Sequence, residues 1–307
     1  MTVGDEVGHR ITSIRHGDVV DIDLTSNTID ATETYSDNSE STINPSLGIR
    51  YRATDWVSLR AAGYQGFRAA TLRELYRTAS TRGGVILVNN PNLEPERLLG
   101  FEVGADFTLQ NDVTLRATIF QNTVEDLIQN ITRGVAGAMP EFIAPCGLIE
   151  ATETCRELDN VGEMEATGVE LEAEYRPSDR WSYFLSYLYN DTEVTKAPDN
   201  PQIVGNQIRQ APKNSFTAKL RNSNRWFDTT LQGRFVDDRF EDDLNRLPVD
   251  SFFLLNAVFS RDFGDSTEVF LAIENLFDKE YEIRVDNDGS SEIGRPRFVS
   301  LGFRYRH

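Results

Sequence analysis

The chain has 307 residues, of which 26% are charged, and 31 basic against 49 acidic residues set a formal net charge of −18. No stretch approaches the ~20 consecutive apolar residues of a transmembrane helix, which excludes a helical membrane protein. An aromatic content of 10% is high for a chain without a core and argues against disorder. The acidic balance argues against nucleic acid as a partner, because phosphate backbones need a basic surface.

Residues 1–42 form an acidic segment that is predicted to be partly loop. Nine acidic residues stand there against Arg10 and Arg15, and only Val19–Leu24 has the pattern of a strand. His9 and His16 lie in this segment, and the chain has no G-x-S-x-G sequence, so no nucleophile–base pair is visible. We therefore predict neither an enzyme nor a bound cofactor.

From residue 43 to residue 307, apolar and polar residues alternate with the period of two that is typical of strands. The clearest unit is a hairpin of 101–109 and 113–119 with an Asn-Asp turn. The same alternation recurs in 47–61, 169–189, 216–235, 252–273 and 299–306, where 252–260 is apolar on both faces and less distinct. This pattern predicts an all-β, antiparallel structure of about 11–12 strands.

The connections between these strands alternate in length. Turns of about three residues join the strands of each hairpin, whereas the gaps between hairpins are long: 67–98, 124–167, 191–214, 236–251 and 275–297. Long loops on one rim and tight turns on the other are typical of a bacterial outer-membrane β-barrel. A soluble β-sandwich has no such rule. The pattern therefore favours a transmembrane β-barrel, with outer-membrane lipid and lipopolysaccharide as its surroundings.

One face of nearly every strand is apolar and the other is charged. A barrel of this size has an interior too wide for side chains to fill, so we expect lipid on the apolar face and a wet lumen on the charged face. Cross-strand pairs of opposite charge there contribute roughly 0.2–1 kcal/mol each. The predicted lumen-facing charges are Arg50, Arg52, Arg60, Glu102, Asp106, Arg116, Glu170, Glu172 and Glu174.

The two cysteines, Cys146 and Cys155, lie nine positions apart with no second Cys or His nearby. A zinc site needs about four such ligands, so the pair predicts a disulfide within the long 124–167 loop, with two free thiols as the alternative. A disulfide implies an oxidising compartment, yet the first residues contain no export signal. We therefore expect the chain to lack its natural beginning.

An acidic run in the 236–251 loop is a weak candidate for Ca²⁺ binding, because Ca²⁺ takes carboxylate oxygens in flexible geometry. A solvated acidic loop is the preferred interpretation. The candidate ligands are Asp237, Asp238, Asp242 and Asp243, together with Glu241.

Four segments carry a family resemblance. All lie at strand ends, and they follow one another in the order that the family has. They are GFRAATLRELY at 66–76, NPNLEPE at 90–96, ENLFDKEY at 274–281, and Gly294-Arg295 before the last strand. From residue 43 to residue 307 the chain resembles the C-terminal barrel part of TonB-dependent outer-membrane receptors. It departs from the family at Ala70, where Pro is usual, and at His307, where an aromatic residue read during barrel assembly is usual.

The resemblance implies a plug domain and a barrel of 22 strands, of which this chain holds about half. We therefore expect an open, incomplete C-terminal portion of a receptor barrel in the bacterial outer membrane. The family also implies coupling to the TonB complex through the missing plug region. The implied ligand is a small molecule, first a ferric siderophore, then cobalamin, haem or a saccharide. An anionic ferric chelate would need attraction from inward arginines at positions 50, 52, 60 and 116.

Two alternatives stay open at this stage. A complete 12-stranded outer-membrane pore would show hydrogen bonding between its first and last strands. A soluble β-rich binding protein would need no detergent for extraction.

Overall fold

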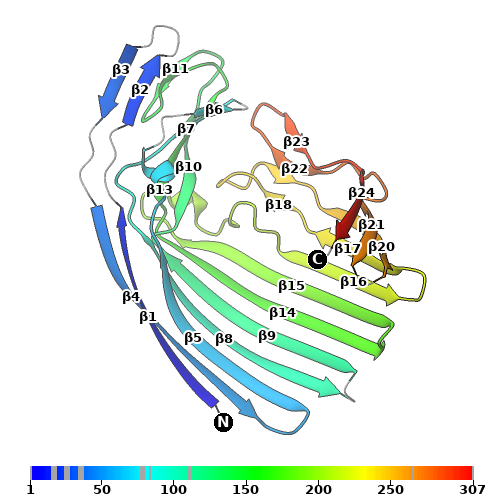
Figure 1. The fold of residues 1–307 in the computed structure, drawn as a ribbon. Coiled ribbons are helices and arrows are strands. Elements are labelled where there is room, and N and C mark those ends of the chain that lie inside the picture. The colour runs from blue at the N-terminus through cyan, green and yellow to red at the C-terminus, as the bar shows by residue number, and fades with distance from the viewer. Residues whose placement is uncertain are drawn as a thin grey trace.

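The computed structural model describes residues 2–14, 19–23, 28–33, 38–76, 80–82, 84–109, 112–264 and 266–305. Twelve strands form one large antiparallel sheet, in which spatial order follows chain order (Figure 1). These strands are β1 (Thr2–Ile14), β4 (Asn38–Arg52), β5 (Val57–Arg68), β8 (Glu96–Leu109), β9 (Val113–Glu125), β14 (Glu163–Ser178), β15 (Trp181–Lys196), β16 (Asn214–Ser223), β17 (Asp228–Val236), β20 (Phe252–Phe263), β21 (Thr267–Glu274) and β24 (Phe298–Tyr305).

The predicted hairpins are confirmed. β8 and β9 pair without interruption from Arg97 opposite Glu125 to Leu109 opposite Val113. The first part of the chain differs from the prediction, because strand was expected there only at 19–24. β1 pairs along its whole length with β4, and β2 (Val19–Asp23) pairs with β3 (Thr28–Glu33). β1 has no clear alternation of its own, and its extended form depends on pairing with a neighbour, which local sequence does not reveal.

The large sheet is curved and open. In the described residues β1 forms a ladder with β4 alone, and β24 forms one with β21 alone, so the two edge strands are not joined. Figure 1 shows them on opposite sides of the sheet. The hydrogen bonding that a closed 12-stranded pore requires is therefore not present between these strands.

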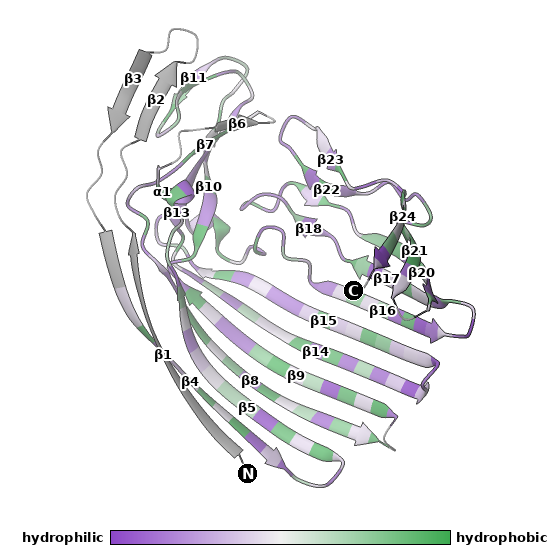
Figure 2. Ribbon diagram, in the orientation of Figure 1, coloured by the Kyte–Doolittle hydropathy of each residue, from purple (hydrophilic) through white to green (hydrophobic). Residues whose placement is uncertain are grey.

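The two faces of the sheet differ as the alternation predicts. Figure 2 shows hydrophobic and hydrophilic residues alternating along β5, β8, β9 and β14. Large apolar side chains are exposed on one face, with Val103 64%, Ile119 62% and Leu301 76% accessible. Among the described residues, no helix has the length and apolar character needed to cross a membrane.

The long connections fold into what we call the loop layer, residues 69–76, 80–82, 84–95, 126–162, 197–213, 237–251 and 275–297. It lies at one end of the large sheet, and the tight turns lie at the other (Figure 1). Its elements are α1 (Leu72–Tyr76), β6 (Ser80–Arg82), β7 (Val85–Val88), β10 (Ile128–Val135), β11 (Glu141–Ile143), β12 (Gly147–Ile149), β13 (Thr154–Asn160), η1 (Pro201–Ile203), β18 (Arg239–Phe240), β19 (Pro248–Val249), β22 (Glu282–Val285) and β23 (Ser291–Ile293).

The loop layer is more ordered than the sequence predicted. The 124–167 connection showed no strand pattern in its middle, yet it forms β10 to β13, and β10 and β13 join β7 and β6 in a four-stranded sheet. These strands are short and pair with distant segments, so their pattern is too brief to recognise. α1 begins with a reciprocal cap, in which the Glu74 carboxylate accepts from Thr71 N at 2.7 Å and Thr71 Oγ1 accepts from Glu74 N at 3.3 Å.

The buried hydrophobic clusters lie mainly in the loop layer and at its junction with the strand ends. Ile131 and Ile203 are fully buried in a cluster with Val161 and Val194. A second cluster surrounds Leu75. A third contains Ile149 and one half of the disulfide.

Candidate functional site

The polar face of the large sheet carries an ion-pair network across β5, β8 and β9. Arg60 extends from β5 across β8 and donates to Thr118 Oγ1 on β9. Its guanidinium also lies 3.3 Å from Asp106 and 3.7 Å from Glu102. Gly104 makes this crossing possible, because a Cβ there would lie 2.8 Å from both the Arg60 guanidinium carbon and the Ala117 carbonyl oxygen. This role of Gly104 is invisible in the local sequence.

The same arrangement recurs four residues along the ladder. Tyr64 of β5 crosses Gly100 of β8, and its hydroxyl donates to Asn122 Oδ1 on β9 at 3.0 Å. Tyr64, Gly100 and Asn122 stand opposite one another in register. A long side chain that covers a glycine on the next strand thus couples three strands on this face.

The remaining predicted charges lie along the same ladders. Arg50 contacts Asp106 at 3.3 Å, and Arg116 contacts Glu172 at 3.1 Å. Glu174 accepts from its near neighbour Arg176 at 2.7 Å. Arg52 stands opposite Ser58 in register. Glu170 stands opposite Thr118.

These pairs correct one expectation. Arg50, Arg60 and Arg116 each bind a carboxylate of the same face, and the nine residues include five acids against four arginines. The charges of these nine residues therefore nearly balance, and the three paired arginines have carboxylate partners within the protein. The sequence showed which charges share a face but not which ones pair.

The loop layer contains a buried acidic run at the positions proposed for calcium. Glu241, Asp242 and Asp243 are 1%, 1% and 4% exposed, so the solvated-loop interpretation is wrong for these three. Among the described residues, no group of three or more His, Cys, Asp or Glu side chains is arranged to hold a metal ion. The candidate calcium site is therefore not formed.

Each of the three acids has its own protein partners. Asp243 accepts from Thr132 N at 2.9 Å and from Thr132 Oγ1 at 2.7 Å. Asp242 accepts from the backbone N–H groups of residues 246 and 247 at 2.8 and 2.9 Å. Glu241 binds Arg209 and lies 3.7 Å from Arg284. Asp243 and Glu241 therefore join the 237–251 loop to other connections, whereas Asp242 stabilises the turn of its own loop.

The other two calcium candidates lie apart from this run. Asp237 accepts from Asn214 Nδ2 at 2.5 Å at the end of a strand, and Asp238 is exposed.

The predicted disulfide is present, since Cys146 and Cys155 are bonded with their Cα atoms 5.8 Å apart. The bond ties the β11–β12 hairpin to β13.

Two buried arginines of the loop layer keep unpaired donors. Arg156 is 5% exposed and donates to Asn287 Oδ1 at 3.3 Å, but its Nε–H has no partner. Arg239 is 6% exposed and donates to Gln210 Oε1 at 2.7 Å and to a backbone carbonyl, while its Nη1 has none. Burial lowers the pKa of both arginines. Sequence patterns did not single out either residue.

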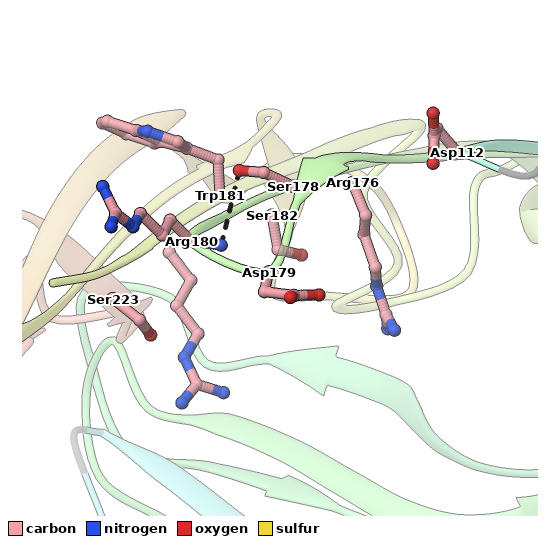
Figure 3. Close-up of a pocket in the computed structure, with 9 residues that line it drawn as sticks. Asp112, Arg176, Ser178, Asp179, Arg180, Trp181, Ser182 and Ser223 are labelled. Carbon is pink, nitrogen blue, oxygen red and sulfur yellow. Dashed lines mark hydrogen bonds between the residues drawn. The ribbon is translucent and has the colours of Figure 1, made fainter.

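A cavity of about 560 Å³ lies among the tight turns, at the opposite end from the loop layer. Figure 3 shows Arg176, Arg180 and Asp179 on one side of the turn and Trp181 pointing to the other. Arg176 pairs with Glu174, and Arg221 lies 3.6 Å from Asp228. The charges of the residues that line the cavity are largely balanced by neighbouring groups of the wall. This cavity is therefore not a distinct anion site.

The family model described as "TonB dependent receptor-like, beta-barrel" matches residues 11–276. The Vitamin B12 transporter BtuB of Vibrio vulnificus is 25% identical over 268 residues, which cover 84% of this chain and 37% of that protein. Heme/hemopexin utilization protein C of Haemophilus influenzae is 28% identical over 171 residues, 50% of this chain and 22% of that protein.

Among solved structures, the ferric yersiniabactin uptake receptor FyuA from Yersinia pestis has a TM-score of 0.66 at 18% identity, covering 99% of this chain and 42% of that one. The siderophore receptor PiuA from Acinetobacter baumannii has a TM-score of 0.63 at 20% identity, covering 90% and 38%. The chain spans less than half the length of each of these four proteins.

An antiparallel sheet with an exposed apolar face, a charged face and long loops at one rim defines the wall of an outer-membrane β-barrel. The family model covers most of the chain, so the chain belongs to the TonB-dependent receptor β-barrel family. Its relatives are outer-membrane transporters and receptors rather than enzymes.

Proposed function

We propose that this chain forms part of the wall and the loop layer of a receptor that imports a ferric siderophore. In this proposal the polar face lines the lumen, and the TonB complex supplies energy through a plug region in the rest of the receptor. The similarity to the siderophore receptors PiuA and FyuA supports this ligand class. Outer-membrane lipid and lipopolysaccharide remain predicted surroundings.

The observation that carries the ligand class is the pair of unsatisfied arginines in the loop layer. Arg50, Arg60 and Arg116 of the wall are paired, so an anionic chelate gains little from them. The Arg156 and Arg239 guanidinium groups are buried and each retains a free N–H. An unpaired buried donor costs about 1–3 kcal/mol, and an anionic oxygen ligand that reached it would recover that cost. A shift of the loop layer would be needed to admit it.

Cobalamin is the second candidate, because BtuB of Vibrio vulnificus aligns with 84% of this chain. Cobalamin would not require cationic donors of the kind that Arg156 and Arg239 present. The two ligand classes therefore differ in their expected dependence on these arginines.

The test is uptake by cells that carry or lack the receptor containing this segment, grown under iron limitation or cobalamin limitation. We expect receptor-dependent uptake of iron from a ferric catecholate or hydroxamate. The R156Q/R239Q double variant should lose most of it, and R116Q, in the paired wall, should keep it. Receptor-dependent uptake of cobalamin alone would overturn the siderophore proposal. The amount of folded receptor at the cell surface, measured by antibody binding, controls for assembly.

A further inference from the structure

A basic side chain stands on the apolar face near the tight-turn rim. Arg261 of β20 is paired in register with Val269 of β21, and its neighbours on the same face are Phe259 and Phe263. In an outer-membrane barrel this face meets lipid, and a charge there must reach the interface or find a counter-ion. Arg261 lies two residues from the end of its strand, so its guanidinium is close to the headgroup level.

Arg261 belongs to a stacked group of cations and aromatic rings. Its guanidinium carbon lies 5.9 Å from the ring centre of Trp226 and 5.0 Å from that of Phe263. Arg225 stacks on the same Trp226 ring at 4.5 Å. Cation–π contacts orient the two guanidinium groups but leave their charge in place. In the part of the chain that the structure describes, the contacts of these two guanidinium groups are with aromatic rings.

An apolar groove of about 300 Å³ begins beside these arginines. Phe227 and Phe259 meet edge-on, 6.4 Å apart, at its border. Its lining is almost wholly hydrocarbon, and the Arg261 side chain is its charged member. The main lining residues are Phe227, Phe259, Phe263, Val269, Leu271 and Leu301.

We propose that this groove and the two arginines form a binding site for an anionic glycerophospholipid. One acyl chain would lie in the groove, and the lipid phosphate would accept hydrogen bonds from Arg225 and Arg261. A lipid is the occupant because the groove lies on the membrane-facing side, and its lining includes Arg261, which shares the Trp226 ring with Arg225. Tight turns of outer-membrane barrels face the periplasm, so the lipid belongs to the periplasmic leaflet. The site is independent of the transported ligand.

The experiment places the receptor containing this segment in nanodiscs and uses Trp226 as the reporter, with W56F/W181F and Phe in place of every other tryptophan. Phosphatidylglycerol and phosphatidylcholine that carry brominated acyl chains are compared as quenchers. Each arginine near an anionic lipid contributes about fivefold, so phosphatidylglycerol should quench at about 25-fold lower mole fraction. R225Q/R261Q should reduce this preference to about twofold or less, and R261K should keep it.

R221Q is the matched control, because Arg221 lies at the same rim on the polar face and pairs with Asp228. It should keep the full preference for phosphatidylglycerol. V269F fills the groove and should weaken quenching by both brominated lipids. Unchanged quenching by phosphatidylcholine in R225Q/R261Q shows that the chain is folded. Equal quenching by the two lipids in the unsubstituted reporter, a preserved preference in R225Q/R261Q, or full competition by dissolved inorganic phosphate would each overturn the proposal.

Discussion

The large sheet and the loop layer place their apolar side chains in opposite ways: the loop layer buries them and the sheet exposes them. In the loop layer, Ile131, Ile149 and Val249 are at most 1% exposed. In the sheet, Val103 and Leu301 are 64% and 76% exposed. The loop layer is organised like a water-soluble domain around hydrophobic clusters, whereas the sheet is organised for a hydrocarbon surrounding. One chain therefore contains a region suited to water, the loop layer, and a region suited to lipid, the sheet.

The difference extends to charged groups. On the sheet, charges pair across neighbouring strands and stay partly accessible, as with Arg116 and Glu172 at 49% and 40% exposure. In the loop layer, Asp243 and Arg156 are more than nine-tenths buried. Charge pairs should therefore matter little to the sheet and much to the loop layer, because a buried charge that loses its partner is costly.

The largest expected effect is at Asp243. D243A removes both acceptors of Thr132 and leaves the buried cations nearby with less compensation. Breaking a buried charged network costs about 3–5 kcal/mol. Hydrogen exchange should show faster exchange in β10 and β13 with little change in β8 and β9. D243N keeps the shape of the side chain and should lose less stability than D243A. Equal acceleration in the sheet would show that the two regions unfold together.

The second effect is at the disulfide. Replacing both Cys146 and Cys155 with serine releases a loop of about ten residues, which costs about 2.7 kcal/mol in the chain-entropy description. Limited proteolysis under non-reducing conditions should cut near β11 and β12 first. Reduction of the unsubstituted chain should reproduce this cleavage pattern. Protease resistance equal to that of the oxidised chain would mean that packing alone holds this hairpin.

The third effect belongs to the sheet. G104V places carbon atoms where the Arg60 side chain now crosses β8 and should cost about 1–3 kcal/mol by overpacking. The shift should appear in urea unfolding of the chain in detergent micelles. G48V is the matched control, because a Cβ at Gly48 meets nothing within 4 Å. Similar midpoints for G104V and G48V would show that the Arg60 crossing does not depend on the glycine.

The smallest effect is the pH response of α1. Burial raises the pKa of Glu74, but hydrogen bonds from Thr71 and Arg68 outweigh it and leave the pKa below its usual value. The stabilisation is therefore fully present above the usual pKa of about 4.3 and is lost as the pH falls through the lowered value. Hydrogen exchange of 72–76 should accelerate in acid. E74Q should show a flatter response, and an equally steep one would assign the effect to another group.

The sequence by itself determined the hairpins of the sheet from β4 onward and the side on which the nine named charges lie. Alternation such as that of 101–109 is a local property, because successive side chains of a strand point to opposite faces whatever the partner is. The lengths of the connections likewise showed that one rim carries the long loops and the other the tight turns. Together with four short segments, these local features were sufficient to indicate the family.

Only the tertiary structure decided the loop layer and the pairing of charges. Thr132 and Asp243 are 111 positions apart, and no local period relates them. Gly104 has its role because of a side chain on the neighbouring strand, and β1 is extended because β4 lies beside it. The stacking of Arg225 and Arg261 on Trp226 also brings the turn before β17 beside strand β20, which is distant in the chain. Such contacts are set by the register between strands, which depends on the whole sheet rather than on neighbouring residues.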